Sequence, residues 1–306
     1  MASGWPALPY ESWQPTRDTL HAHTQVLGKL AVALAPPEPQ LQHAALRLTA
    51  RGWETNPLPA PDGSGAFVAA LDLRAYEAVV EHSDGRDRRT ALTPDRAVGE
   101  VTRDVLAAVG ELAGSVTINP TPQETPWKTP LDEDEEHASF DRAQIDAYFE
   151  AATRAAHVLA AVRAPYRGRS TPVNAWWGSF DLAVGLFSGR TVEPPSDDFI
   201  WRNSGDAEQV AVGWWPGDAR HPQAAFFGYA YPPPEGLAEA ALAPAASYWD
   251  TKLGEFVLDW DDIRELPDPH GAALEFARSV VRQGCAACGW DQPLAASAEG
   301  VPPPIR

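Results

Sequence analysis

The spacing of hydrophobic residues divides the chain into helices and short strands. Apolar residues recur every three to four positions in four segments, which predicts α-helices over 11–35, 94–112, 142–164 and 269–288. Alternating or short apolar runs predict strands over 44–50, 66–73, 76–82, 88–92, 115–119, 171–190, 208–215, 224–231, 248–249 and 255–259. Turn residues such as Ser83-Asp84-Gly85 separate neighbouring runs, so the strands are expected to pair as antiparallel hairpins.

The predicted elements follow the same order twice along the chain. Each half has a long helix, then several antiparallel strands, then a closing helix. This order predicts an α+β fold with two antiparallel sheets backed by helices, in pseudo-duplicated halves with a cleft between them. The predicted halves are residues 1–119 and 142–292, with the site on the second. An acidic, proline-rich connector over 120–141 joins them, and a disordered tail over 293–306 ends the chain.

Composition narrows the class of protein. The 306 residues are 44% hydrophobic, and 42 acidic against 24 basic residues give a formal net charge of −18. A surface this acidic repels phosphate backbones, so no nucleic-acid partner is expected. No apolar run reaches the roughly 18 residues of a membrane helix, and the first ten residues lack the pattern of a signal peptide. The sequence therefore predicts a soluble, cytoplasmic protein without a membrane partner.

The stretch from Thr171 to Arg190 places polar side chains in a segment with the pattern of a buried strand. Asn174, Asp181 and Arg190 would be costly to bury without partners, so the stretch indicates either a polar cavity or a structural network. The site predicted around it has four titratable catalytic candidates, namely Asp181, Glu208, Asp134 and His137. Its substrate-binding candidates are Asn174, Trp176, Trp177, Arg190, Trp215 and Tyr229.

Each candidate also has a structural interpretation. Strand alternation lets only one of Trp176 and Trp177 face a given side, and tryptophans more often belong to a core than to a ligand cage. Asp181 and Arg190 are equally consistent with a buried ion pair. The acidic run 132–136 favours a solvated loop, and His23 and Lys29 favour the water-facing side of the first helix.

The Cys285-x-x-Cys288 pair matches both a redox dithiol and half of a zinc site. It stands at the tail of a predicted helix, and no second Cys or His pair completes zinc coordination. The favoured interpretation is therefore that the two cysteines are small apolar residues on a terminal helix.

Four motifs carry a resemblance to a known family: TPVNAWWGSFDLAVGLFSGR, VGWWPGD, FFGYAYPPP and TQVLGKL. With them the chain resembles, over nearly all its length, a bacterial domain family of unknown function. The resemblance implies a histidine at position 174 and a His-Glu pair at 207–208, which with His137 would resemble a metal or acid/base constellation. This chain has Asn174 and Ala207-Glu208 there, so no metal is expected.

No nucleotide-binding glycine motif and no G-x-S-x-G nucleophile motif occurs, so no cofactor is expected. These features favour a small-molecule enzyme that uses general acid/base chemistry in an aromatic-lined pocket. The alternative is a non-catalytic protein that binds a small molecule and has lost the family's metal or acid/base site.

Overall fold

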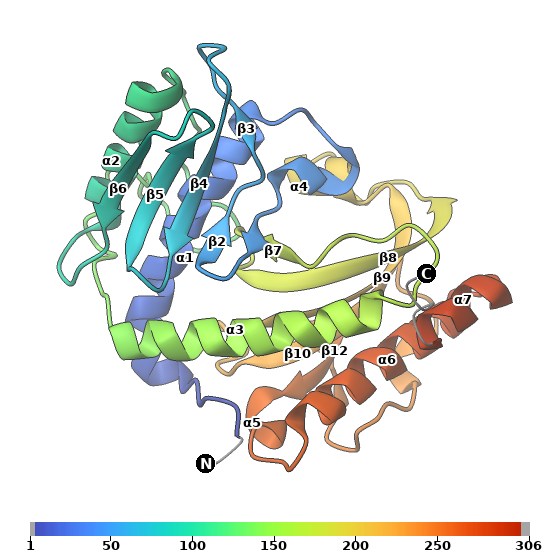
Figure 1. Ribbon diagram of the computed structural model, residues 1–306. Coiled ribbons are helices and arrows are strands. Elements are labelled where there is room, and N and C mark those ends of the chain that lie inside the picture. The colour runs from blue at the N-terminus through green and yellow to red at the C-terminus, as the bar shows by residue number, and fades with distance from the viewer. Residues whose placement is uncertain (1–3, 301–306) are drawn as a thin grey trace. The chain divides into compact units, whose positions relative to one another are not determined.

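The computed structural model describes residues 4–300 and has an α+β fold with two antiparallel sheets, as predicted. The chain divides into two compact units (Figure 1). We call Glu11–Phe149 together with Ala175–Phe180 the N-terminal unit. Met1–Tyr10, Glu150–Asn174 and Asp181–Arg306 form the C-terminal unit. The short segment Ala175–Phe180 thus belongs to the N-terminal unit, although the chain on both sides of it belongs to the other. The predicted boundaries at 119 and 142 stay a prediction.

The N-terminal unit contains one sheet with helices. Helix α1 (Tyr10–Leu34) leads through η1 (Pro39–Ala44) into strands of order β1-β2-β4-β5-β6, with β3 paired to β4. The strands are β1 (Arg47–Leu48), β2 (Gly52–Glu54), β3 (Leu58–Pro59), β4 (Ala66–Asp72), β5 (Glu77–His82) and β6 (Asp87–Ala91). Helix α2 (Val98–Ala113) then packs on β5 and β6, as Figure 1 shows. Trp53 and Tyr148 stack on Phe180 at ring-centroid distances of 5.3 and 5.2 Å in the core of this unit.

The second sheet has the order β11-β12-β10-β9-β8-β7. Its strands are β7 (Asn174–Trp176), β8 (Asp181–Thr191), β9 (Ala207–Trp215), β10 (Ala225–Tyr231), β11 (Tyr248–Asp250) and β12 (Glu255–Asp259). The helices of this half of the chain are α3 (Arg142–Arg163), α4 (Phe199–Ser204), η2 (Leu237–Glu239), α5 (Trp260–Ile263), α6 (Pro269–Ala287) and α7 (Gln292–Glu299).

Helix α6 packs on β9, β10 and β12, and glycines permit its close approach. A Cβ on Gly228 would lie 2.5 Å from Val280, and one on Gly284 would lie 2.9 Å from Val210. Trp214 turns to the same side as Gly228, whereas Trp215 turns to the other side, because neighbouring strand residues alternate. The side chains of the two tryptophans therefore lie on opposite faces of the sheet.

Several elements differ from the predicted ones. Residues 115–119 form no strand, because this short run is bounded by Gly114 and Pro120 and finds no partner strand. Helix α7 occupies the first half of the tail that was expected to be disordered, and residues 301–306 lie outside the described part of the chain. Strands β2 and β3 and helices α4 and α5 were not predicted. Between residues 4 and 300, no helix is long and apolar enough to cross a membrane.

Candidate functional site

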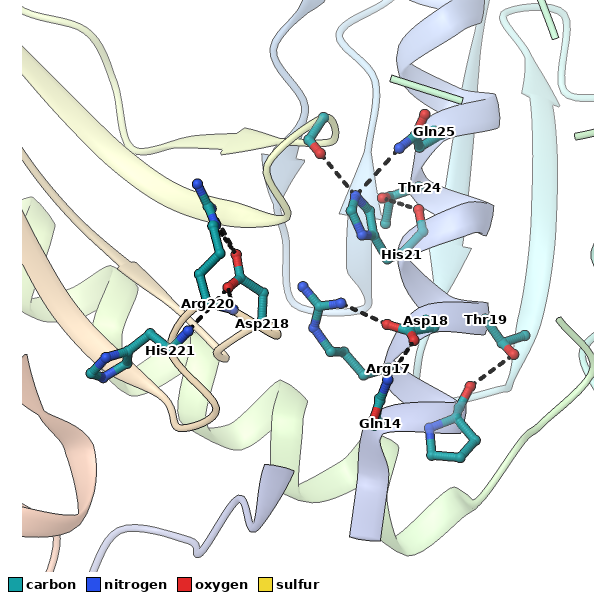
Figure 2. A network of polar contacts seen from close by, with 12 residues as sticks. Gln14, Arg17, Asp18, Thr19, His21, Thr24, Gln25, Asp218, Arg220 and His221 are labelled. Carbon is teal, nitrogen blue, oxygen red and sulfur yellow. Dashed lines mark hydrogen bonds and ion pairs between the residues drawn. The ribbon is translucent and has the colours of Figure 1, made fainter. Parts of the chain in front are cut away.

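Four buried polar side chains follow one another at four-residue intervals on α1: Arg17, His21, Gln25 and Lys29. This spacing places them on one face of a helix, and we call them the α1 polar stripe. Figure 2 shows Arg17 and His21 projecting from the same side of α1. Burying such groups is unfavourable unless each finds a partner, so their contacts decide whether the stripe is structural or functional.

His21 is held as a neutral imidazole. Its Nε2 lies 3.0 Å from the carbonyl oxygens of Trp177 and Gly178, and its ring stacks on Phe180 at 4.9 Å. Burial and the positive charge of Arg17 lower the pKa of His21 to about 3. Nε2 also lies 3.4 Å from Gln25 Nε2, but its two shorter contacts are to carbonyl oxygens, so Nε2 carries the proton and donates it to them. Nδ1 is then a buried acceptor, without a hydrogen-bond partner among the described residues.

The other stripe members also have distinct partners. Arg17 pairs with Asp18 at 2.6 Å and lies over the Phe180 ring. Gln25 donates to the carbonyl oxygen of Gln123 and accepts from its N–H, both at 2.8 Å, and so fixes the proline-rich segment 120–131 against α1. Lys29 lies over the indole of Trp177, with Nζ 5.4 Å from the ring centroid.

Trp177 packs directly on α1. A Cβ on Gly28 would lie 2.1 Å from its indole, so only glycine leaves room for the ring. The indole Nε1 donates to the carbonyl oxygen of Ala44 at 3.0 Å, which fixes the ring orientation. One residue therefore contacts two stripe members, His21 through its carbonyl oxygen and Lys29 through its ring.

Asp134 and His137 form a hydrogen-bonded pair in the acidic segment. His137 Nδ1 lies 2.7 Å from Asp134 Oδ2, while Oδ1 accepts the backbone N–H groups of Glu136 and His137. Burial alone would lower the pKa of His137, but the hydrogen bond and charge of Asp134 outweigh it and raise that pKa. Burial opposes ionisation of Asp134, but its hydrogen bonds, led by that with the His137 side chain, keep its pKa below the usual value.

The pair lies beside the polar stripe. The ring of Trp127 contacts both imidazoles, at centroid distances of 4.4 Å from His137 and 5.2 Å from His21. Thr19 Oγ1 accepts the N–H of Ser139, and Thr16 Oγ1 accepts that of Asp141, so α1 also holds the chain just after His137. A cavity of about 360 Å³ is lined by residues of this segment and of α1, including Thr16, Asp95, Ser139, Asp141 and Gln144.

The family model of DUF5996, a family of unknown function, matches residues 5–297. The chain belongs to DUF5996. This confirms the resemblance to a family of unknown function that the sequence motifs suggest. No curated protein and no solved structure matches the chain.

In this DUF5996 protein the predicted site residues fall into separate groups. Asp134, His137, Trp176 and Trp177 belong to the N-terminal unit. The six others belong to the C-terminal unit: Asn174, Asp181, Arg190, Glu208, Trp215 and Tyr229. Among residues 4–300, no three His, Cys, Asp or Glu side chains are placed to hold a metal ion.

Arg190 is bound to its own unit. Its guanidinium lies 3.4 Å from Glu208 and donates to the carbonyl oxygens of Cys288 and Gly289 at the end of α6. Asp181 and Arg190 stand at opposite ends of β8, nine residues and about 30 Å apart, so the alternative of a buried Asp181–Arg190 pair is wrong. Both Asn174 and Asp181 are buried and have polar or electrostatic interactions of their own.

The C-terminal unit has a second His-Asp pair. His221 Nε2 lies 2.7 Å from Asp259, and the His221 ring is 5.4 Å from Trp215. Asp218, drawn with Arg220 and His221 in Figure 2, accepts from Arg220 at 2.7 Å. Tyr229 stacks on Phe227 next to Trp215, so these two predicted residues lie in an aromatic cluster of this sheet.

One structural interpretation of α1 is wrong, because His23 and Lys29 are buried rather than water-facing. The acidic run 132–136 is a loop with Glu133, Glu135 and Glu136 exposed, as expected, and Asp134 is the buried exception within it.

Arg17, His21 and Gln25 were not among the predicted site residues. Polar residues recur at every fourth position inside an otherwise apolar helix, and this spacing is the signal that could have found them. A surface helix shows the same spacing, so the pattern alone does not distinguish a buried polar stripe from a water-facing one.

Cys285 is buried and Cys288 is half-buried, and both thiols have low reactivity. Burial raises the pKa of Cys285 to about 12 and that of Cys288 to about 11. At pH 8 we expect an aromatic disulfide reagent to modify either thiol about 10²-fold more slowly than free cysteine, because the thiolate is the attacking form. Rapid modification of the folded protein, or an internal disulfide formed under mild oxidation, would contradict this.

Proposed function

We propose that this DUF5996 protein is a small-molecule enzyme that uses general acid/base chemistry, with His137 as the proton-transfer group and Asp134 as its positioning residue. The single observation that carries the proposal is the 2.7 Å contact between His137 Nδ1 and a nearly fully buried carboxylate. A proton on Nδ1 leaves Nε2 of the neutral ring as the base, and the His137 side chain keeps 11% of its surface exposed.

The surroundings support this role. Trp127 provides an aromatic wall against the His137 ring, and the stripe of α1 supplies further polar groups next to it. No nucleotide cofactor and no metal is part of the proposal. We place the activity in the bacterial cytoplasm, where two free thiols are stable. The net charge of −18 favours a small-molecule ligand over nucleic acid.

The test is a panel of small esters, lactones, amides and enolisable carbonyl compounds, screened with the wild-type protein and then with variants. For any compound turned over, His137→Gln is expected to lower kcat/KM by about 10²- to 10⁴-fold. The matched control is His221→Gln, which removes the other Asp-paired histidine and is expected to keep the activity. A loss with His221→Gln and none with His137→Gln would contradict the proposal.

Asp134→Asn is expected to lower the pKa of His137, because the charge that opposes burial is removed while the burial remains. The acidic limb of the pH–rate profile should therefore move to lower pH, since the base form of His137 then persists there. Titration of the His137 ring protons by NMR measures the same shift without a substrate. An unchanged His137 pKa in Asp134→Asn would contradict the role given to Asp134.

Absence of turnover over the whole panel, together with ligands that stabilise the fold, would favour the alternative of a non-catalytic binding protein.

A further inference from the structure

We infer that Lys29 binds an anionic group, a carboxylate or a phosphate, of the molecule that this protein acts on. This inference rests on the proposed function, because it names the substrate class of the same site. It starts from a single unusual feature, a largely buried lysine side chain whose ammonium nitrogen reaches the surface and has no counter-ion among the described residues.

Lys29 is only 6% exposed, yet the described residues offer it no carboxylate within ion-pair distance and no hydrogen-bond acceptor. The chain has 42 acidic residues, so carboxylates are plentiful elsewhere. Arg17, three turns earlier on the same stripe, pairs with Asp18. A buried charge without a partner is unfavourable in a folded protein, and such a group marks a place where a ligand can supply the missing charge.

The surroundings of Lys29 suit an anion. The Trp177 indole, fixed by Gly28 and by the carbonyl oxygen of Ala44, forms a rigid apolar wall beside the ammonium group. Coulombic attraction is stronger next to such a wall than in water. Burial lowers the pKa of Lys29 to about 8, which agrees with a charge that no protein group compensates.

Lys29 is also connected to the proposed catalytic pair. Trp177 contacts Lys29 through its ring and His21 through its carbonyl oxygen, and Trp127 contacts both His21 and His137. Lys29 lies eight residues from His21, about 12 Å along α1. A molecule held by its anionic end at Lys29 must therefore extend along α1 to reach the neighbourhood of His137.

The chain has three lysines, Lys29, Lys128 and Lys252, which makes a labelling experiment unambiguous. The folded protein is acetylated briefly with acetic anhydride at pH 7, in sodium chloride or in inorganic phosphate of equal ionic strength, and each lysine is quantified by mass spectrometry. Phosphate bound at Lys29 raises its pKa, and a rise of one unit lowers the free-amine fraction, and hence its labelling, about tenfold. Exposed Lys128 and Lys252 serve as internal controls whose labelling should not change.

Acetate in place of phosphate distinguishes a carboxylate site from a phosphate site. Equal labelling of Lys29 in chloride, acetate and phosphate would overturn the inference. So would a Lys29 that is never labelled, because an amine closed to a small reagent is also closed to a small anion. The experiment reports binding alone, so it can succeed even where the activity panel finds no turnover.

Variants give a second readout. Phosphate or acetate is expected to raise the Tm of the wild-type protein above its value in chloride, and Lys29→Met should lose this rise because it keeps the contact with Trp177 but not the charge. Lys128→Met is the matched control and should keep it. A rise that persists in Lys29→Met would place the anion elsewhere and overturn the inference.

Discussion

Replacing Gly28 by alanine is expected to destabilise the protein by about 3 kcal/mol. The added Cβ would lie 2.1 Å from the Cγ and Cδ1 atoms of Trp177, much closer than any real contact between carbon atoms. The indole has little room to retreat, because its Nε1 donates to the carbonyl oxygen of Ala44. Urea denaturation followed by circular dichroism measures the free energy of unfolding of both proteins.

Helix propensity alone predicts the opposite sign, since alanine in a helix is favoured over glycine by up to about 1 kcal/mol. Gly110→Ala in α2 is the matched control, because a Cβ there meets nothing within 4 Å. We expect this variant to be slightly more stable than the wild type. If Gly28→Ala and Gly110→Ala behaved alike, the close contact between α1 and Trp177 would be wrong.

Hydrophobic periodicity was sufficient to predict the main elements. The predicted segments 66–73, 76–82, 208–215 and 224–231 correspond to β4, β5, β9 and β10, and the four predicted helices correspond to α1, α2, α3 and α6. These elements are long enough for several repeats of their pattern, or are bounded by clear turn residues. Two-residue strands such as β1 and β3 contain no repeat, so their pairing with β2 and β4 defines them rather than a pattern of their own.

The candidate site was predicted only in part, for a related reason. The Asp134–His137 pair is local, three residues apart, and the sequence raised it as a candidate. The polar stripe of α1 depends on contacts with Trp177, Gly178 and Phe180, which lie more than 150 residues away from His21. The local sequence around a helical histidine is the same whether its ring contacts water or a backbone carbonyl from a distant part of the chain. The burial of His21 therefore depends on long-range packing, which the local pattern does not reveal.

Acid is expected to destabilise this protein strongly well above the pH at which carboxylates titrate. Burial lowers the pKa of His21 to about 3 and that of His23 to about 4, whereas both have a pKa near 6.5 in an unfolded chain. Below pH 6.5 these two imidazoles therefore bind protons in the unfolded chain, whereas in the folded protein they stay neutral. The free energy of unfolding should fall as the pH decreases, by about 3 kcal/mol for each histidine by pH 4.

Other groups also contribute to this pH dependence. Burial raises the pKa of Glu255 to about 7, so between pH 7 and about 4.5 the folded protein binds a proton that the unfolded chain does not, which offsets part of the histidine effect. The raised pKa of His137 acts in the opposite sense, because its contribution to stability is complete below pH 6.5 and is lost as the pH rises through the folded pKa. The lowered pKa of Asp134 has its effect where the pH falls below the usual aspartate value. The interval from pH 6.5 to 4 therefore reports on the two buried imidazoles of α1, less the opposing proton of Glu255.

Urea denaturation at several pH values between 4 and 7 measures the slope, which equals the difference in bound protons between the unfolded and folded states. His23→Leu is expected to reduce this difference by about one proton, because it removes one of the two buried imidazoles. His157→Gln, at an exposed position on α3, is the control and should leave the slope in place. A wild-type stability that rises as the pH falls from 6.5 to 4, as Glu255 alone would make it, would mean that water reaches both imidazoles in the folded protein. The α1 polar stripe would then be an open surface, and the neutral His21 that donates to the Trp177 and Gly178 carbonyl oxygens would be wrong.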